Sequence, residues 1–369
     1  MRDAFERVDV PDTDGARDRA WQVVRTSFAT REPVPRKRRR WPLAAALAAV
    51  ALVAGLVSPP GRAVLDELRE AVGVERAQPA LFSLPAPGRL LVSSDAGVWV
   101  VQQDGSRRLL GPYREASWSP FGRYVVVVRE NELAALEPDG SVRWTLARPR
   151  PTSPRWTGSA ADTRIAYLDR TGIRVVPGDG TGDRLLTPER ATFDWRPRSG
   201  FVLGQLHGSE LRLQDARTGR VVDRIRAGLG AEALDWSPNG RRALVVHPRE
   251  VTLVDSRSDT VRPVAFPAGD VVAAAFSPDG GTIAVLREGE LLLIDARRPS
   301  IRRRVFAGAG PFAGLAWSPD GRWLLVGWPG ADQWIFVKAD GKRIRAVSNV
   351  SRQFRTRAFP RIEGWCCAP

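Results

Sequence analysis

A six-residue motif returns along this chain at a nearly constant interval. Its clearest copies are WSPFGR at 118–123, WSPNGR at 236–241, FSPDG at 276–280 and WSPDGR at 317–322. Two weaker copies begin at Trp156 and Trp195. The six leading aromatics, at positions 118, 156, 195, 236, 276 and 317, are separated by 38, 39, 41, 40 and 41 residues. A period near forty residues requires a fold built from repeated supersecondary units.

Each repeat contains four short apolar runs separated by turn residues. The unit that begins at Trp236 continues with runs at 243–246, 251–255 and 261–264. The unit that begins at Phe276 has the same layout, and Gly, Asp, Asn and Pro stand between the runs in both. Four strands in about 40–45 residues is the size of one blade of a β-propeller.

The two ends of the repeat region predict a further blade. Runs at 89–92, 98–101 and 108–110 have the character of second, third and fourth strands with no first strand before them. The run at 362–367 has the character of a first strand with nothing after it. Pairing the two ends would close the ring and hide two exposed sheet edges. We therefore predict an all-β, seven-bladed propeller closed by its N- and C-terminal strands, with an insertion around 349–357.

The repeat also resembles that of a known family. The pattern A-[FW]-S-P-[DN]-G is similar to the repeat of TolB-like propellers, which are relatives of the WD-repeat proteins, over about residues 85–369. This resemblance implies the fold. It does not imply one function, because sites of many kinds are built on the same scaffold.

A membrane anchor is predicted before the propeller. Residues 36–40 are five consecutive basic residues, and 41–58 contain no charge. Eighteen residues in a helix span about 27 Å, close to the hydrocarbon thickness of a bilayer. The basic cluster places the N-terminus in the cytoplasm and the propeller outside the plasma membrane. The alternative, a cleaved signal peptide, needs a small-x-small site, which residues 55–59 match poorly.

The remaining N-terminal segments are expected to flank this anchor. Residues 1–40 form a basic, amphipathic cytoplasmic tail in which Trp21, Val24 and Phe28 share one helical face. That face either docks on a cytoplasmic partner such as a transcription regulator or lies on the membrane surface. Residues 59–87 form a short juxtamembrane helix and a linker, and the propeller occupies 88–369.

The charge of the chain does not by itself predict a nucleic-acid partner. The formal net charge is +15, and 53 of the 56 basic residues are arginine because only three are lysine. No nucleic-acid-binding motif accompanies the charge. The excess of arginine, together with abundant Ala, Gly and Pro, is typical of a GC-rich genome.

Few residues point to catalysis. Only two histidines occur, and no G-x-S-x-G or H-E-x-x-H motif is present. Cys366 and Cys367 are neighbours on a predicted strand, so their side chains are expected on opposite faces, as free thiols. No metal site and no cofactor are predicted.

A ligand site, if the propeller has one, is expected at its central channel. Among the residues directly before the leading aromatics, the charged ones are Arg155, Asp194 and Asp235. They either bind a ligand or tie blades together through buried hydrogen bonds. We expect a non-catalytic scaffold or sensor that binds a protein or cell-envelope ligand. The alternatives are a transmembrane signalling regulator that acts through its tail, and a hydrolase or lyase with its site in the channel.

Overall fold

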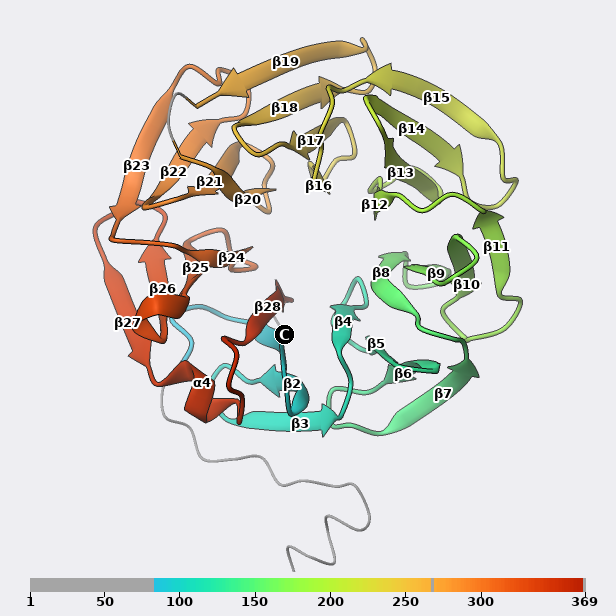
Figure 1. Ribbon diagram of the computed structural model, residues 1–369, viewed down its shortest axis with the longest axis horizontal. Helices are drawn as coiled ribbons and strands as arrows, with labels where there is room; N and C mark the ends of the chain where they lie inside the picture. Colours follow the sequence, from blue (N-terminus) through green and yellow to red (C-terminus); the bar gives the residue numbers. More distant parts are fainter. Residues whose placement is uncertain (1–82, 267–268, 368–369) are drawn as a thin grey trace, which may run out of the picture. The chain divides into compact units, whose positions relative to one another are not determined.

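Seven four-stranded antiparallel sheets follow one another around a ring (Figure 1). The computed structural model describes residues 83–266 and 269–367. We name the sheets blades A to G in chain order. In every blade the innermost strand carries the leading aromatic of the sequence motif, and the blade then extends outward through three further strands. The predicted seven-bladed propeller is confirmed.

Blade A closes the ring in the way the sequence predicts. Its innermost strand is β28 (Arg361–Cys366), and its other strands are β1 (Arg89–Ser94), β2 (Gly97–Val101) and β3 (Arg107–Gly111). Strands β28 and β1 pair antiparallel, with Trp365 opposite Leu90. The expected insertion holds the short helix α4 (Val350–Gln353) between blade G and β28.

Blades B, C and D each come from one continuous stretch of chain. Blade B consists of β4 (Glu115–Trp118), β5 (Val125–Arg129), β6 (Glu132–Leu136) and β7 (Val142–Ala147). Blade C consists of β8 (Thr152–Gly158), β9 (Thr163–Leu168), β10 (Ile173–Pro177) and β11 (Arg184–Thr187). Blade D consists of β12 (Thr192–Trp195), β13 (Val202–His207), β14 (Glu210–Asp215) and β15 (Val221–Arg226).

Blades E, F and G repeat this arrangement. Blade E consists of β16 (Ala233–Trp236), β17 (Arg242–Val246), β18 (Glu250–Asp255) and β19 (Thr260–Ala265). Blade F consists of β20 (Val271–Phe276), β21 (Thr282–Arg287), β22 (Glu290–Asp295) and β23 (Arg302–Ala307). Blade G consists of β24 (Ala313–Trp317), β25 (Trp323–Trp328), the 3-10 turn η1 (Pro329–Ala331), β26 (Gln333–Lys338) and β27 (Ile344–Ser348).

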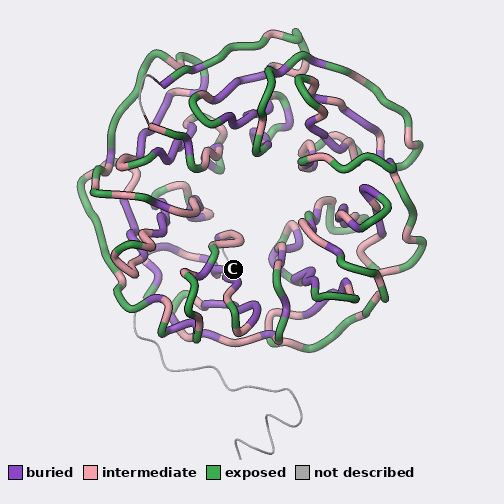
Figure 2. Tube along the Cα trace, viewed as in Figure 1, coloured by how far each residue is buried: buried purple, intermediate pink, exposed green. Residues whose placement is uncertain are grey.

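The hydrophobic core lies between the blades. On β5, Val125 and Val127 pack into the cluster shared with blade A, whereas Val126 and Val128 pack into the cluster shared with blade C. Successive side chains of a strand point to opposite faces, so a strand between two blades must be apolar on both. Figure 2 shows the consequence, with burial concentrated in the middle strands and exposure at the outer rim.

The repeated Ser-Pro-Asp-Gly turn satisfies a buried hydroxyl. Ser318 is 0% exposed; its Oγ donates to Asp320 Oδ1 at 2.6 Å and accepts from the Trp323 backbone N–H at 2.9 Å. Gly321 has φ +67°, a conformation that other residues rarely adopt. Ser277 and Ser237 make the equivalent hydrogen bonds in blades F and E. The motif therefore recurs because its serine and its Asp or Asn form the hydrogen bonds of the turn, and its glycine adopts the positive φ that the turn requires.

Arginine side chains join neighbouring blades. Guanidinium N–H groups of Arg184, Arg242 and Arg303 donate to backbone carbonyls of the next blade, at 2.8 Å to Arg217, 2.6 Å to Ala296 and 2.6 Å to Ala339. A guanidinium presents five N–H donors in a fixed fork, which suits it to cap carbonyls at turns. Part of the arginine excess is thus used inside the ring.

The prediction of two free thiols is wrong. The structure joins Cys366 and Cys367 in a disulfide. The expectation assumed that both residues continue one strand, whose side chains alternate in direction. Strand β28 instead ends at Cys366, and Cys367 turns into the left-handed region with φ +55°. That turn brings the second side chain back to the first.

Within residues 83–266 and 269–367, no helix is long and apolar enough to cross a membrane.

The predicted cytoplasmic tail at 1–40, the transmembrane helix at 41–58 and the juxtamembrane helix and linker up to residue 82 lie outside the described residues.

Removing the buried hydroxyl of the repeated turn should weaken the ring. We expect Ser318→Ala to lower the melting temperature by about 2–4 °C, because about 1 kcal/mol is lost when the Trp323 N–H loses its acceptor. Circular dichroism during heating measures the change. Ser258→Ala, which removes an exposed hydroxyl, is the control and should leave the melting temperature unchanged. An equal shift in both variants would contradict this account of the motif.

Candidate functional site

The two faces of the ring carry different connections. The loops that enter the innermost strands, and those between the second and third strands, lie on one face, which we call the loop face. The turns that follow the innermost strands lie on the other, which we call the turn face. This division follows from antiparallel pairing within every blade, because alternate connections fall at opposite ends of the strands.

Arg155 lines a hollow on the loop face. The hollow has a volume of about 460 Å³ and lies beside the innermost strands of blades C, D and E. Its wall combines charged, hydroxyl and apolar side chains, among them Arg155, Arg190, Glu232, Ser153, Thr192, Phe193 and Leu234. The Arg155 side chain donates only to the carbonyl of its neighbour Pro154, at 3.0 Å. Within the described part of the chain it forms no ion pair.

Asp235 ties two blades together. Its Oδ2 accepts a hydrogen bond from the Phe276 backbone N–H of blade F at 2.7 Å. The pKa of Asp235 is raised to about 7, chiefly because burial penalises the carboxylate and also because the charge of Asp194 lies nearby. For this residue the structure favours the second alternative from the sequence, a buried hydrogen bond between blades.

Asp194 makes no such link. Among the residues that the structure describes, its Oδ1 accepts only from the backbone N–H of Trp195, its own neighbour, at 2.9 Å. Burial raises the pKa of Asp194 to about 6, and the positive charge of Arg155 limits the rise. The three residues singled out in the sequence are therefore brought together: Arg155, Asp194 and Asp235 interact in series from blade C to blade E.

Two more acids lie on innermost strands near these residues. Neither was predicted from the sequence. Glu363 on β28 accepts from the Ser93 hydroxyl and lies 3.4 Å from Arg361, and burial raises its pKa. Glu115 on β4 accepts from the Ser153 backbone N–H at 2.6 Å, linking blades B and C. They stand two and three residues before their aromatics, whereas the predicted site residues stand directly before theirs.

The innermost strands divide into two kinds. Blades A to E contribute Glu363, Glu115, Arg155, Asp194 and Asp235, whereas β20 and β24 of blades F and G carry no charged residue. The inner wall therefore has a charged arc and an apolar arc. Such an arrangement orients a ligand that has both polar and apolar parts.

The other predicted site, the docking face of Trp21, Val24 and Phe28, lies outside the described residues. Among residues 83–266 and 269–367, no group of three or more His, Cys, Asp or Glu side chains is placed to hold a metal ion.

Comparisons with known proteins identify the fold. No protein-family model matches the chain. No curated protein matches it either. Among solved structures 1466 chains are similar, so the architecture is too widespread to indicate one activity. One is described as Kuenenia stuttgartiensis hydrazine synthase; it is 14% identical, has a TM-score of 0.51, and the match covers 72% of this chain and 81% of that one. At this identity the likeness establishes a shared propeller fold.

The raised pKa values of Asp194 and Asp235 should make the stability of the fold depend on pH. An ordinary Asp has a pKa near 3.9, so the raised values of Asp194 and Asp235 mean that the folded state holds protons which the unfolded chain has released. Their stabilising contribution is full below about pH 4 and is lost as pH rises through about 6 and 7. We expect the melting temperature to fall from pH 5 to pH 8, and to fall by about 1–3 °C less in Asp194→Asn.

Asp270→Asn, at an exposed carboxylate, is the matched control and should retain the full slope. Equal slopes in the unmodified chain and Asp194→Asn would contradict the assignment of this titration to the channel wall.

Proposed function

We propose that this chain is a single-pass, membrane-anchored, extracytoplasmic β-propeller that binds a protein or cell-envelope ligand on its loop face, and that it is a TolB-like propeller. The observation that carries the binding role is the hollow beside Arg155. Arg155, which has no ion-pair partner among residues 83–266 and 269–367, lies there next to apolar side chains, in a wall held in place by strands of three blades. A rigid ring with exposed loops is suited to recognition.

The membrane anchor in this proposal is supported by sequence. Five basic residues at 36–40 precede the uncharged segment 41–58, which has the length and flank of a retained signal anchor. The resemblance of the Trp-Ser-Pro-Asp-Gly repeat supports the TolB-like assignment.

Topology is tested by labelling introduced cysteines in intact cells. Phe121→Cys places a thiol at a 61% exposed position on the propeller, and Thr13→Cys places one in the predicted tail. A membrane-impermeant maleimide should label Phe121→Cys in intact cells and Thr13→Cys only after lysis. Labelling of both only after lysis would contradict an extracytoplasmic propeller.

Ligand binding is tested by crosslinking and affinity capture from membranes. The unmodified chain should capture an envelope component, and Arg155→Ala should capture about tenfold less of it, because a desolvated charged contact contributes more than about 1.4 kcal/mol. Arg257→Ala, at an exposed arginine on the turn face, is the control and should capture the same amount. Equal capture by all three proteins would contradict a site at Arg155.

The same experiment separates the scaffold from the signalling alternative. A variant that lacks residues 1–40 removes Trp21, Val24 and Phe28 while leaving the propeller intact. An envelope partner retained by this variant supports the external scaffold. A cytoplasmic regulator lost only from this variant would instead support signalling through the tail.

A further inference from the structure

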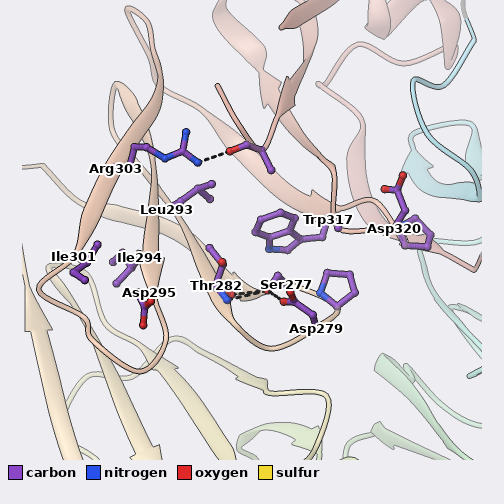
Figure 3. Close-up of a pocket in the computed structure, with 14 residues that line it drawn as sticks. Ser277, Asp279, Thr282, Leu293, Ile294, Asp295, Ile301, Arg303, Trp317 and Asp320 are labelled. Carbon is purple, nitrogen blue, oxygen red and sulfur yellow. Dashed lines mark hydrogen bonds between the residues drawn. The ribbon is translucent and has the colours of Figure 1, made fainter. Parts of the chain in front are cut away.

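The turn face carries a groove between blades F and G that the proposed function does not use. It has a volume of about 520 Å³, within the range of ligand-binding clefts. Figure 3 shows Trp317 at its centre, with Thr282 and Leu293 along one wall and Ile301 at its outer end. Two prolines complete the apolar lining, Pro278 from blade F and Pro319 from blade G.

The matching groove between blades G and A is already filled by a peptide. Leu84 and Ala86, from the segment that leads into the propeller, belong to the same buried cluster as Trp323, Phe336 and Trp365. The Trp365 indole N–H donates to the Pro87 carbonyl at 3.1 Å, and the Leu84 N–H donates to Gln103 O at 2.9 Å. A Ser-Leu-Pro-Ala-Pro segment, which bends from Pro85 onward, is therefore the occupant of an inter-blade groove in this molecule.

Three lining positions of the two grooves are equivalent. Trp323 and Thr282 each donate their backbone N–H to the serine of the preceding turn. Phe336 and Leu293 each pair with the third residue of the second strand. Trp365 and Trp317 are the leading aromatics of the next blade. The repeat thus places the same type of wall at both sites.

One position distinguishes the open groove from the groove between blades E and F. The residue equivalent to Thr282 is Tyr124 in blade B, which stacks on Trp156 at 6.1 Å between ring centroids. In blade E it is Arg242, which reaches across to the Ala296 carbonyl at 2.6 Å. Arg242 fills the space between blades E and F except for about 60 Å³, whereas a groove of about 460 Å³ remains beside Tyr124. Thr282 is too short to reach across as Arg242 does, and the space above Trp317 stays open.

Carboxylates border this groove. Asp279, Asp295 and Asp320 line it. Asp320 pairs with Arg322 at 4.0 Å and Asp295 lies near the charges of Arg298 and Arg297, whereas Asp279 has no ion pair within the described part of the chain. The Ser277 hydroxyl and the Gly281 N–H hold the pKa of Asp279 below its ordinary value, so this carboxylate is ionised at neutral pH. Asp279 can therefore meet a positively charged group of a ligand.

We propose that the groove between blades F and G binds a proline-containing apolar peptide that carries a basic residue, supplied by a partner protein. The apolar residues lie over Trp317 and Leu293, as Leu84 and Ala86 lie in the neighbouring groove, and the basic residue meets Asp279. This site is on the face opposite the hollow beside Arg155, so its test does not depend on the proposed function.

A synthetic peptide with the sequence of residues 83–89, Ser-Leu-Pro-Ala-Pro-Gly-Arg, is the direct probe. Labelled with a fluorophore and titrated with the full chain, it should show a saturable rise in anisotropy. The groove between blades G and A does not compete for it, because the chain's own segment is tethered there at a high effective concentration. A control peptide with Asp in place of Leu should bind at least about tenfold more weakly.

Two substitutions locate the binding. Thr282→Arg introduces the side chain found at the matching position of blade E and should weaken binding by about tenfold. Ile301→Asp changes a 49% exposed residue of the groove and should weaken it similarly. Ile344→Asp, at a 51% exposed residue outside the groove, is the matched control and should bind like the unmodified chain. The melting temperature of each variant checks folding.

Three results would overturn the proposal. The first is no binding by the full chain. The second is unchanged affinity in a folded Thr282→Arg or Ile301→Asp variant, or for the control peptide. The third is a concentration-dependent dimer that Thr282→Arg abolishes, because the occupant would then be a second copy of the chain.

Discussion

Closure of the ring by β28 and β1 is the pairing on which the other contacts depend. Each blade buries its two faces against two neighbours, so a blade with one missing neighbour would expose an entire apolar face. The hydrogen bonds from Trp365 to Pro87 and from β28 to β1 bring residues more than 250 positions apart into one sheet. With this pairing made, no blade is terminal, and neither end of the array needs the polar cap that open repeat arrays require.

The same geometry determines how polar groups are used. The inner edge of each blade has unpaired backbone groups, and acids on the innermost strands bond to some of them: Asp235 to Phe276 and Glu115 to Ser153. At the outer edge, guanidinium groups such as that of Arg303 cap the carbonyls of the next blade. Hydrogen bonds of this kind contribute only about 1 kcal/mol each, but every blade boundary is held by several of them. Many of the charges of this propeller are therefore partners of backbone groups.

Departures from the repeat mark the places where binding is proposed. Asp194 occupies the position of Asp235 but makes no bond to the next blade, and it lies close to the exposed Arg155. Thr282 occupies the position of Arg242 but does not reach across to the next blade. A repeat protein offers many equivalent positions for packing. Where a residue does not contact the next blade as its equivalents do, its surface or charge is available to a ligand.

The sequence alone determined the repeat, the number of blades and the closure. These follow from local rules, since the period, the strand alternation and the turn chemistry of Ser318 and Gly321 are readable residue by residue. Only the tertiary structure decided which acids meet, that Glu363 and Glu115 join the charged arc, that Cys367 turns back on Cys366, and that a leading segment fills one inter-blade groove while the next stays open. The reason is physical: each of these depends on the distance between side chains of different blades, or on a single backbone angle, and strand periodicity specifies neither.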